Sequence, residues 1–283
     1  MTGQTGLTIR GLTLSIRSKQ GDKRILRGID LDVPTGTVTG LAGESGSGKT
    51  MTGLAACGLQ PPGSLMGGTI ALQGERVDVP NLLALRSKAL NRVRGREIAM
   101  VFQDPTASLH PMISIGGQLT DHMRYHLDLS KKDARDRAVE LLERVKVPNA
   151  RAALDRYPHQ FSGGQLQRVA IASAIACDPG VLIADEPTTA LDVTVQAGVL
   201  RLLRELCDDL GLAVLLVTHD LGVMSAVADT IAVMHDGEIV EHGDRRQVIQ
   251  EPRSDYTRSL IESLPKTPPP GARTDDEEAA DAR

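Results

Sequence analysis

The segment GESGSGKT, residues 43–50, constrains this chain of 283 residues more than any other feature. It follows a short apolar run at Val38–Leu41 and precedes a segment at Thr50–Gly58 that is expected to be helical. A glycine-rich loop between a strand and a helix lets successive backbone N–H groups surround a phosphate at the helix N-terminus. The pattern predicts that Lys49 reaches the β- and γ-phosphates of a nucleotide and that the Thr50 hydroxyl holds Mg²⁺. The residues expected to bind nucleotide here are Gly43, Glu44, Ser45, Gly46, Ser47, Gly48, Lys49, Thr50 and Met51.

A pair of acidic residues, Asp185 and Glu186, follows a fully apolar strand at Val181–Ala184. Alone, such a pair is an ordinary polar strand end, but together with a phosphate-binding loop it predicts a division of roles. Asp185 is expected to reach the metal held by Thr50. Glu186 points in a different direction and is expected to take a proton from an attacking water.

The segment FSGGQLQR, residues 161–168, begins a helix whose first backbone N–H groups and dipole suit a phosphate. By itself this is an ordinary glycine-rich helix start. Together with the motifs above it resembles the signature of ABC-type ATPases, and further motifs occur in the order typical of that family. Gln103 in VFQDP resembles the Q-loop glutamine, Asp192 in ADEPTTALD the D-loop aspartate, and His219 in VTHD the switch histidine.

This resemblance covers about residues 7–264 and implies a fold. The expected class is α/β, a P-loop NTPase of the ABC ATPase type with a RecA-like, mostly parallel core sheet. An N-terminal antiparallel β-subdomain and an inserted α-helical subdomain at about residues 81–165 complete it. Residues 265–283 are rich in proline and then acidic, a composition that predicts a disordered tail.

The resemblance also implies a mechanism in which two chains pair head to tail and enclose two ATP molecules, with Mg²⁺ as the metal. Water would attack the γ-phosphate in line, giving ADP and phosphate. One half-site would comprise Lys49, Thr50, Gln103, Asp185, Glu186 and His219, with catalytic roles for Glu186, His219, Lys49 and Gln103 and metal contacts from Thr50, Gln103 and Asp185. The partner's ATP would be bound by Ser162, Gly163 and Gln165, with Gly164 and Asp192 as further nucleotide-binding residues.

One departure from the family concerns the adenine. ABC ATPases usually stack adenine on an aromatic residue of the first strands, whereas this sequence has no aromatic residue before Phe102. The equivalent position lies near Ile16. We therefore expect ATP to bind more weakly, by about 1 kcal/mol of lost stacking.

Three stretches resemble the ATPases of dipeptide, oligopeptide and nickel importers: VFQDPTASLHPMISIGGQL, ADEPTTALDVTVQ and EPRSDYTRSLIESLP. The resemblance implies peptide import, with a nickel or metal-chelate importer as the alternative in the same group. The implied partners are a second ABC ATPase subunit, favoured as a different chain, two transmembrane permease subunits and an extracytoplasmic substrate-binding protein. The implied location is peripheral, on the cytoplasmic face of the inner membrane.

Composition weighs against other classes. No apolar run approaches the ~18 residues of a membrane helix, and the first residues do not resemble a secretory signal. With 32 basic and 36 acidic residues, no nucleic-acid partner is expected. The three cysteines lack the spacing of a disulfide framework or metal site. An ABC ATPase of DNA repair or translation remains a lesser alternative, although the chain has no zinc-type cysteine spacing or second cassette. An exporter ATPase is another.

The pattern of apolar residues predicts further elements. Leu7–Ile9 and Leu12–Ile16 are expected as two strands, and about residues 81–161 as mainly helical, with a helix from Ser130 to Val147 capped by Ser130. A helix capped by Asp192 and closed by Gly211, and a hairpin over residues 231–241, are also expected. A basic cluster is either a solvated helix face or a contact with the membrane or permeases: Arg86, Lys88, Arg92, Arg94 and Arg96.

Overall fold

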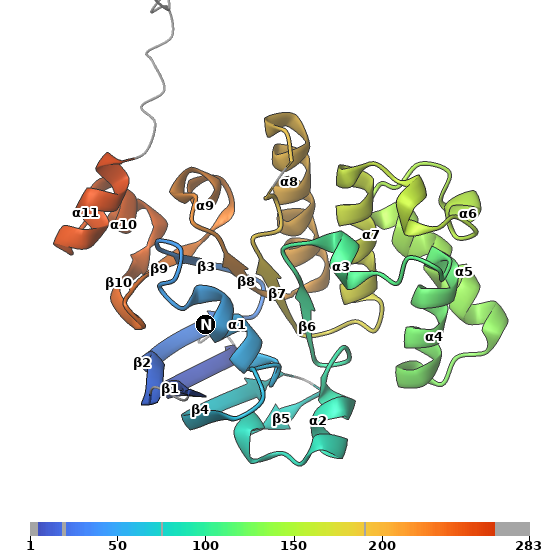
Figure 1. Ribbon diagram of the computed structural model, residues 1–283. Helices are drawn as coiled ribbons and strands as arrows, with labels where there is room; N and C mark the ends of the chain where they lie inside the picture. Colours follow the sequence, from blue (N-terminus) through green and yellow to red (C-terminus); the bar gives the residue numbers. More distant parts are fainter. Residues whose placement is uncertain (1–4, 19–20, 75, 190, 264–283) are drawn as a thin grey trace, which may run out of the picture.

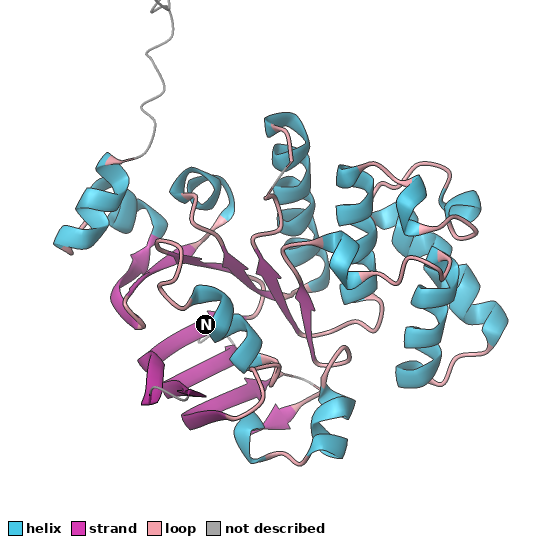
Figure 2. Ribbon diagram, viewed as in Figure 1, coloured by secondary structure: helices cyan, strands magenta, loops and turns pink. Residues whose placement is uncertain are grey.

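The computed structural model describes residues 5–18, 21–74, 76–189 and 191–263. The expected disordered tail at 265–283, and residue 264 at the end of the expected domain, lie outside these residues. Two sheets and the helices around them make up the described chain (Figures 1 and 2). None of the described helices is long and apolar enough to cross a membrane.

The first sheet is antiparallel, has four strands in the order β2-β1-β4-β5 and is formed mainly by the N-terminal part of the chain. Its strands are β1 (Thr5–Ser18), β2 (Gly21–Pro34), β4 (Ser64–Gln73) and β5 (Asp78–Val79). The two strands expected at residues 7–9 and 12–16 are in fact one strand, β1. The pairing register shifts between Ile9 and Leu12, where Gly11 has φ +56°. This bulge bends β1 without ending it, which explains the apparent break in the sequence pattern.

The second sheet has six strands in the order β10-β9-β3-β8-β7-β6 and is parallel except for β10. Three strands at its centre, β3 (Val38–Ala42), β8 (Ala213–Val217) and β7 (Val181–Asp185), are buried along their whole length. Such unbroken apolar runs are typical of parallel strands covered on both faces. The β9–β10 hairpin (Thr230–His235 and Glu238–Asp244) confirms the one expected from the sequence.

Residues 81–161 are mainly helical as expected, but the edge strand β6 (Ile98–Val101), which the sequence pattern did not predict, interrupts them. It pairs in parallel with β7, with Ile98 opposite Val181 and Val101 opposite Ala184. A four-residue apolar run cannot be distinguished from part of a buried helix by its periodicity, because neither pattern has room to repeat. Gln103 therefore follows a strand of the central sheet.

After β6, the helices α4, α5 and α6 lie together at one side of the molecule, whereas α2 precedes β6 and lies beside β5 (Figure 1). Ser130 accepts a hydrogen bond from the N–H of Asp133 and caps α5 as expected. The helix ends at Arg144 rather than Val147, since Lys146 adopts a left-handed φ of +61°. The elements of this region are η1 (Leu82–Ala84), α2 (Ser87–Val93), α3 (Pro105–Ser108), α4 (Ile115–Leu127), α5 (Lys131–Arg144), α6 (Ala150–Ala153) and η2 (Pro158–Gln160).

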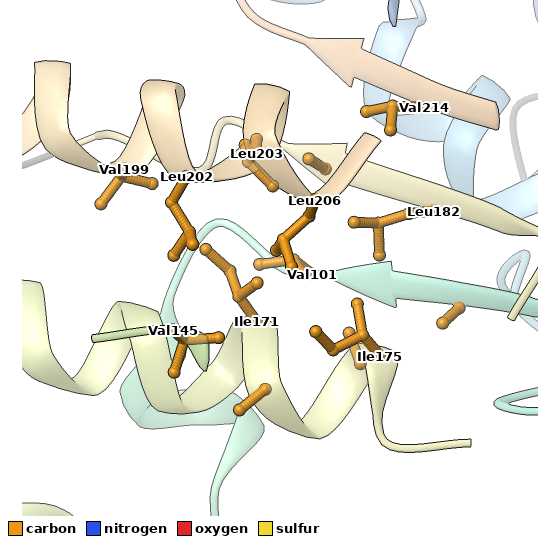
Figure 3. Packing of buried hydrophobic residues seen from close by; sticks show 14 of the residues in the cluster. Val101, Val145, Ile171, Ile175, Leu182, Val199, Leu202, Leu203, Leu206 and Val214 are labelled. Atoms are coloured by element: carbon orange, nitrogen blue, oxygen red, sulfur yellow. The ribbon is translucent and has the colours of Figure 1, made fainter. Parts of the chain in front are cut away.

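Alternate side chains of the central sheet enter two different cores. Val181 and Ile183 of β7 face the antiparallel sheet and α1 (Lys49–Ala56), whereas Leu182 and Ala184 face α7 and α8. Figure 3 shows the second core, in which leucines of α8 and isoleucines of α7 meet beside Val101 of β6 and Leu182 of β7. These helices and the C-terminal ones are α7 (Gly163–Ile175), α8 (Val193–Leu210), α9 (Leu221–Val227), α10 (Arg245–Gln250) and α11 (Asp255–Glu262). Both faces of the central sheet are thus covered by buried apolar side chains.

Candidate functional site

The glycine-rich loop lies between β3 and α1, as the sequence predicts. Its glycines Gly43, Gly46 and Gly48 have φ values of +146°, +86° and +108°, a region that other residues rarely adopt. At Gly43 a Cβ atom would lie 2.1 Å from the carbonyl oxygen of Met234. The loop can therefore take this path only because glycine occupies that position.

Lys49 at the start of α1 is almost completely buried, with 5% of its surface exposed. Its Nζ donates to the carbonyl oxygens of Gly43 and Glu44, each at 2.7 Å. Burial lowers the pKa of Lys49, although the nearby acidic residues Glu186, Asp185 and Glu44 favour its charged form. In this structure the Lys49 ammonium group thus bonds to carbonyl groups of the loop itself.

The loop also contains a buried hydroxyl, which points away from the other groups of the loop that are open to a ligand. The side-chain oxygen of Ser47 is buried and has no hydrogen-bond partner among the described residues. The backbone N–H groups of a loop with these glycine conformations suit a phosphate as their acceptor.

Thr50 and Asp185, which are 135 residues apart in the sequence, meet at the end of β7. The Thr50 hydroxyl donates to a carboxylate oxygen of Asp185 at 3.1 Å. Asp185 is 3% exposed, and burial raises its pKa despite that hydrogen bond. A hydroxyl and a carboxylate side by side supply oxygen ligands of the kind that Mg²⁺ prefers.

Glu186, immediately after β7, is the centre of a hydrogen-bond cluster. One carboxylate oxygen accepts from Gln103 Nε2 and from the Thr189 hydroxyl, each at 3.0 Å, and the other lies 3.0 Å from Nδ1 of His219. The backbone of Glu186 has a left-handed φ of +43°, and its N–H donates to the carbonyl of Val217. Burial alone would raise the pKa of Glu186, but the hydrogen bonds from His219 and Thr189 outweigh it and lower the pKa. The group is therefore an ionised carboxylate held in a fixed orientation.

These residues share one cleft with a volume of about 790 Å³. Its walls include the loop from Gly43 to Met51 except the buried Ser47, together with Gln103, Glu186 and His219. The structure thus brings together the expected half-site, except that Asp185 lies behind the cleft wall and contacts Thr50.

The sequence did not indicate four other residues of the wall. Thr189 lies three residues after Glu186, and a search for hydroxyls near that carboxylate could have found it. Lys23 and Ile25 on β2 and Leu260 on α11 carry no signal in the local pattern. None of the described residues of this wall is Phe, Tyr or Trp, and the expected weakening of ATP binding stays a prediction.

The residues expected to serve a partner's ATP lie elsewhere. Ser162 accepts from the N–H of Gln165 and caps α7, and the Gln165 side chain accepts from the N–H of Ser162 in return. Asp192 accepts from the N–H of Val195 and caps α8. Neither they nor Gly163 and Gly164 are among the described residues that line the cleft.

Two members of the basic cluster are tied to the protein itself. Arg94 donates to the carbonyls of Cys57 and Gly58, and Arg96 donates to the carbonyl of His126. The other three members, Arg86, Lys88 and Arg92, are exposed on or beside α2. Their exposure is compatible both with a solvated helix face and with a contact to the membrane or permeases.

Comparison with known proteins identifies the family. A family model described as ABC transporter matches residues 26–189, which is more than half of the chain. The chain belongs to the ABC transporter family. This ABC ATPase is 42% identical over 268 residues to a candidate peptide import ATP-binding protein of Brucella melitensis biotype 1, covering 94% of this chain and 79% of that protein. A similarly described protein of Brucella abortus is 44% identical over 260 residues, covering 92% and 77%.

Solved structures agree with the fold. A bacterial ABC transporter cassette in dimeric form is similar with a TM-score of 0.73 and 28% identity, covering 85% of this chain and 99% of that one. The same cassette in a post-hydrolysis state with ADP and phosphate gives a TM-score of 0.72. The fold class and the ATP-hydrolysing activity expected from the motifs are thereby confirmed.

Proposed function

We propose that this chain is the ATP-hydrolysing subunit of an importer that takes up peptides. The observation that carries the substrate class is the identity of 42–44% over more than nine-tenths of the chain to proteins described as candidate peptide import ATP-binding proteins. The same proposal treats residues 7–264 as one ATPase domain with a helical subdomain inserted at about residues 81–165. It supposes a peripheral position on the cytoplasmic face of the inner membrane.

The proposed chemistry follows from the contacts in the cleft. The loop N–H groups and Lys49 would hold the phosphates of ATP. Thr50, Asp185 and Gln103 would hold Mg²⁺, which would neutralise charge on the phosphate oxygens during transfer. Glu186 would accept the proton of the attacking water, since its carboxylate is ionised and oriented by three hydrogen bonds. His219 would help to hold both Glu186 and the γ-phosphate in place.

We propose that the working unit is a pair of ATPase subunits, arranged so that each completes the other's site. This arrangement would give a role to residues that lie outside the cleft of their own chain, and a similar cassette has been solved as a dimer. The segment after Phe161 and the D-loop would then face the ATP of the partner. The residues assigned to that contact are Ser162, Gly163, Gly164, Gln165 and Asp192.

A second cavity suits a permease segment. It has a volume of about 200 Å³ and is lined mainly by apolar residues between the central sheet, α4 and α7. Leu59 and Phe102 at this cavity are 40% and 38% exposed. Phe102 directly precedes Gln103, which donates to Glu186. A permease segment seated here would therefore act on the proposed base through two adjacent residues.

The proposal is tested by purifying the tagged full-length chain from its native membranes in mild detergent and identifying the accompanying proteins by mass spectrometry. Recovery of two permeases and a second ATPase supports it, and the associated binding protein is then titrated with peptides and with nickel complexes. Recovery only from the soluble fraction with ribosomal or nucleic-acid partners contradicts it. Tighter binding of nickel complexes than of any peptide contradicts the substrate class.

The docking cavity is tested by Leu59→Asp, which should abolish recovery of the permeases while ATP binding stays intact. Leu65→Asp is the matched control, because Leu65 is 44% exposed and lies on β4 away from the residues that line the cavity. If both variants recover the permeases equally, the permeases do not dock here.

A further inference from the structure

The C-terminal helix α11 reaches the nucleotide cleft although it lies outside the matched ABC transporter region, residues 26–189. Tyr256 and Leu260 are four residues apart and so lie on the same face of this helix. Leu260 lines the cleft that contains the phosphate-binding loop. Tyr256 contacts the loop itself.

Tyr256 makes two contacts at the start of the loop. Its hydroxyl accepts a hydrogen bond from the backbone N–H of Glu44 at 3.2 Å. Its ring lies against the ring of His235 at the end of β9, with 4.0 Å between the ring centroids. The ring contact sets the position of the side chain, so that the hydroxyl meets the loop.

The hydrogen bond falls on a particular peptide unit. The N–H of Glu44 and the carbonyl of Gly43 belong to the same peptide group, and that carbonyl accepts from Lys49 Nζ at 2.7 Å. Tyr256 therefore binds the N–H of this peptide group and Lys49 binds its carbonyl oxygen. Gly43 has no side chain of its own to restrict the orientation of this peptide.

The base of α11 is itself fastened to β10 by a buried carboxylate. Glu241 is 7% exposed and accepts from the backbone N–H groups of Arg253 and Ser254, at 2.9 and 3.0 Å, and from Gln247 Nε2 at 3.0 Å. Hydrogen bonds to a charged acceptor are stronger than neutral ones. This anchor places Tyr256 at a fixed distance from the loop.

We infer that Tyr256 is a positioning residue for ATP binding: its hydroxyl holds the Gly43–Glu44 peptide in the orientation that Lys49 and the phosphate-binding loop need. The inference rests on the proposed role of this loop. A loop held in its binding conformation loses less entropy when the phosphates bind. The C-terminal helix thereby contributes to ATP affinity without touching the reacting atoms.

The test uses the full-length chain and the variant Tyr256→Phe, which keeps the ring and removes only the hydroxyl. The expected results are faster hydrogen exchange at the Glu44 amide and ATP binding weakened about three- to tenfold, the range for one lost hydrogen bond. The rate at saturating ATP and the melting temperature should stay unchanged. Tyr125→Phe is the matched control, because Tyr125 on α4 is 72% exposed, and it should leave all four quantities unchanged.

A second variant tests the route through the anchor. Glu241→Gln should also weaken ATP binding, and in the double variant the effect of Tyr256→Phe should shrink, because the helix no longer holds the ring in place. If the effects of Glu241→Gln and Tyr256→Phe on ATP binding are fully additive, Glu241 does not act through Tyr256. Unchanged ATP affinity in Tyr256→Phe, or a loss that merely follows a lower melting temperature, would overturn the inference.

Lys49→Ala separates this inference from the proposed role of the loop. If Lys49→Ala abolishes ATP binding and Tyr256→Phe leaves it unchanged, only the positioning role fails. If Lys49→Ala binds ATP as well as the unaltered chain does, the assignment of the loop fails and the inference fails with it.

Discussion

Replacing Glu186 with glutamine would remove its capacity to accept a proton while keeping its shape. The Glu186 side chain is 16% exposed, and its three partners lie at 3.0 Å. A glutamine oxygen can accept from both Gln103 and Thr189, and its NH₂ group can donate to Nδ1 of His219 in the suitable tautomer. All three contacts can therefore persist, and we expect the unfolding free energy to change by less than about 1 kcal/mol.

The rate should respond very differently. Loss of a general base lowers kcat by about 10²- to 10⁴-fold, or about 3–5 kcal/mol in activation free energy. The assay is phosphate release at saturating ATP and Mg²⁺ by the purified complex, with ATP affinity measured by equilibrium dialysis. We expect that affinity to stay within about threefold, because the phosphate-binding groups are untouched.

Glu205→Gln is the matched control, because it is the same substitution at an exposed site. Glu205 lies on α8 and forms an exposed ion pair with Lys146. Its kcat should stay within about twofold of the unaltered value. If Glu186→Gln keeps more than about a tenth of kcat, Glu186 is not the general base. If it loses ATP binding, the carboxylate has a binding role that the cleft geometry does not predict.

Three other predictions concern stability and thiol reactivity. Leu206 on α8 is 1% exposed and packs in the core between α8, α7 and the central sheet. Leu206→Ala should therefore lower the free energy of unfolding, measured in urea, by about 2–5 kcal/mol, and a smaller loss would mean that this core repacks. Burial favours a higher pKa for Glu241, but the N–H groups of Arg253 and Ser254 lower it below the ordinary 4.5. The stability that Glu241 provides is therefore complete above pH 4.5 and lost as the pH falls through its lower folded pKa, and Glu241→Gln should flatten this part of a denaturation series. Burial raises the thiol pKa to about 12 for Cys57 and to about 11 for Cys177 and Cys207. At about pH 8 these thiols of the native protein should therefore resist alkylation by iodoacetamide, and mass spectrometry should detect their alkylation only after urea has exposed them.

Much of this protein is predictable from local patterns, because those patterns record local physical requirements. The loop at residues 43–50 needs glycine where φ is positive, and Ser130 and Asp192 are visible as caps because capping acts over three residues. The buried strands β3, β7 and β8 are apolar throughout because both of their faces are covered. These features also supplied the motifs that indicated the family.

The tertiary structure decided which of these pieces meet. Strand order places β6 beside β7 and β7 beside β8, and only that order brings Gln103, Glu186 and His219 together from the ends of three strands. The short strand β6 was missed since four residues are too few to show a period. The contact of Tyr256 with Glu44 spans 212 residues. No local pattern encodes it, because a hydrogen bond between distant segments depends on how the whole chain packs.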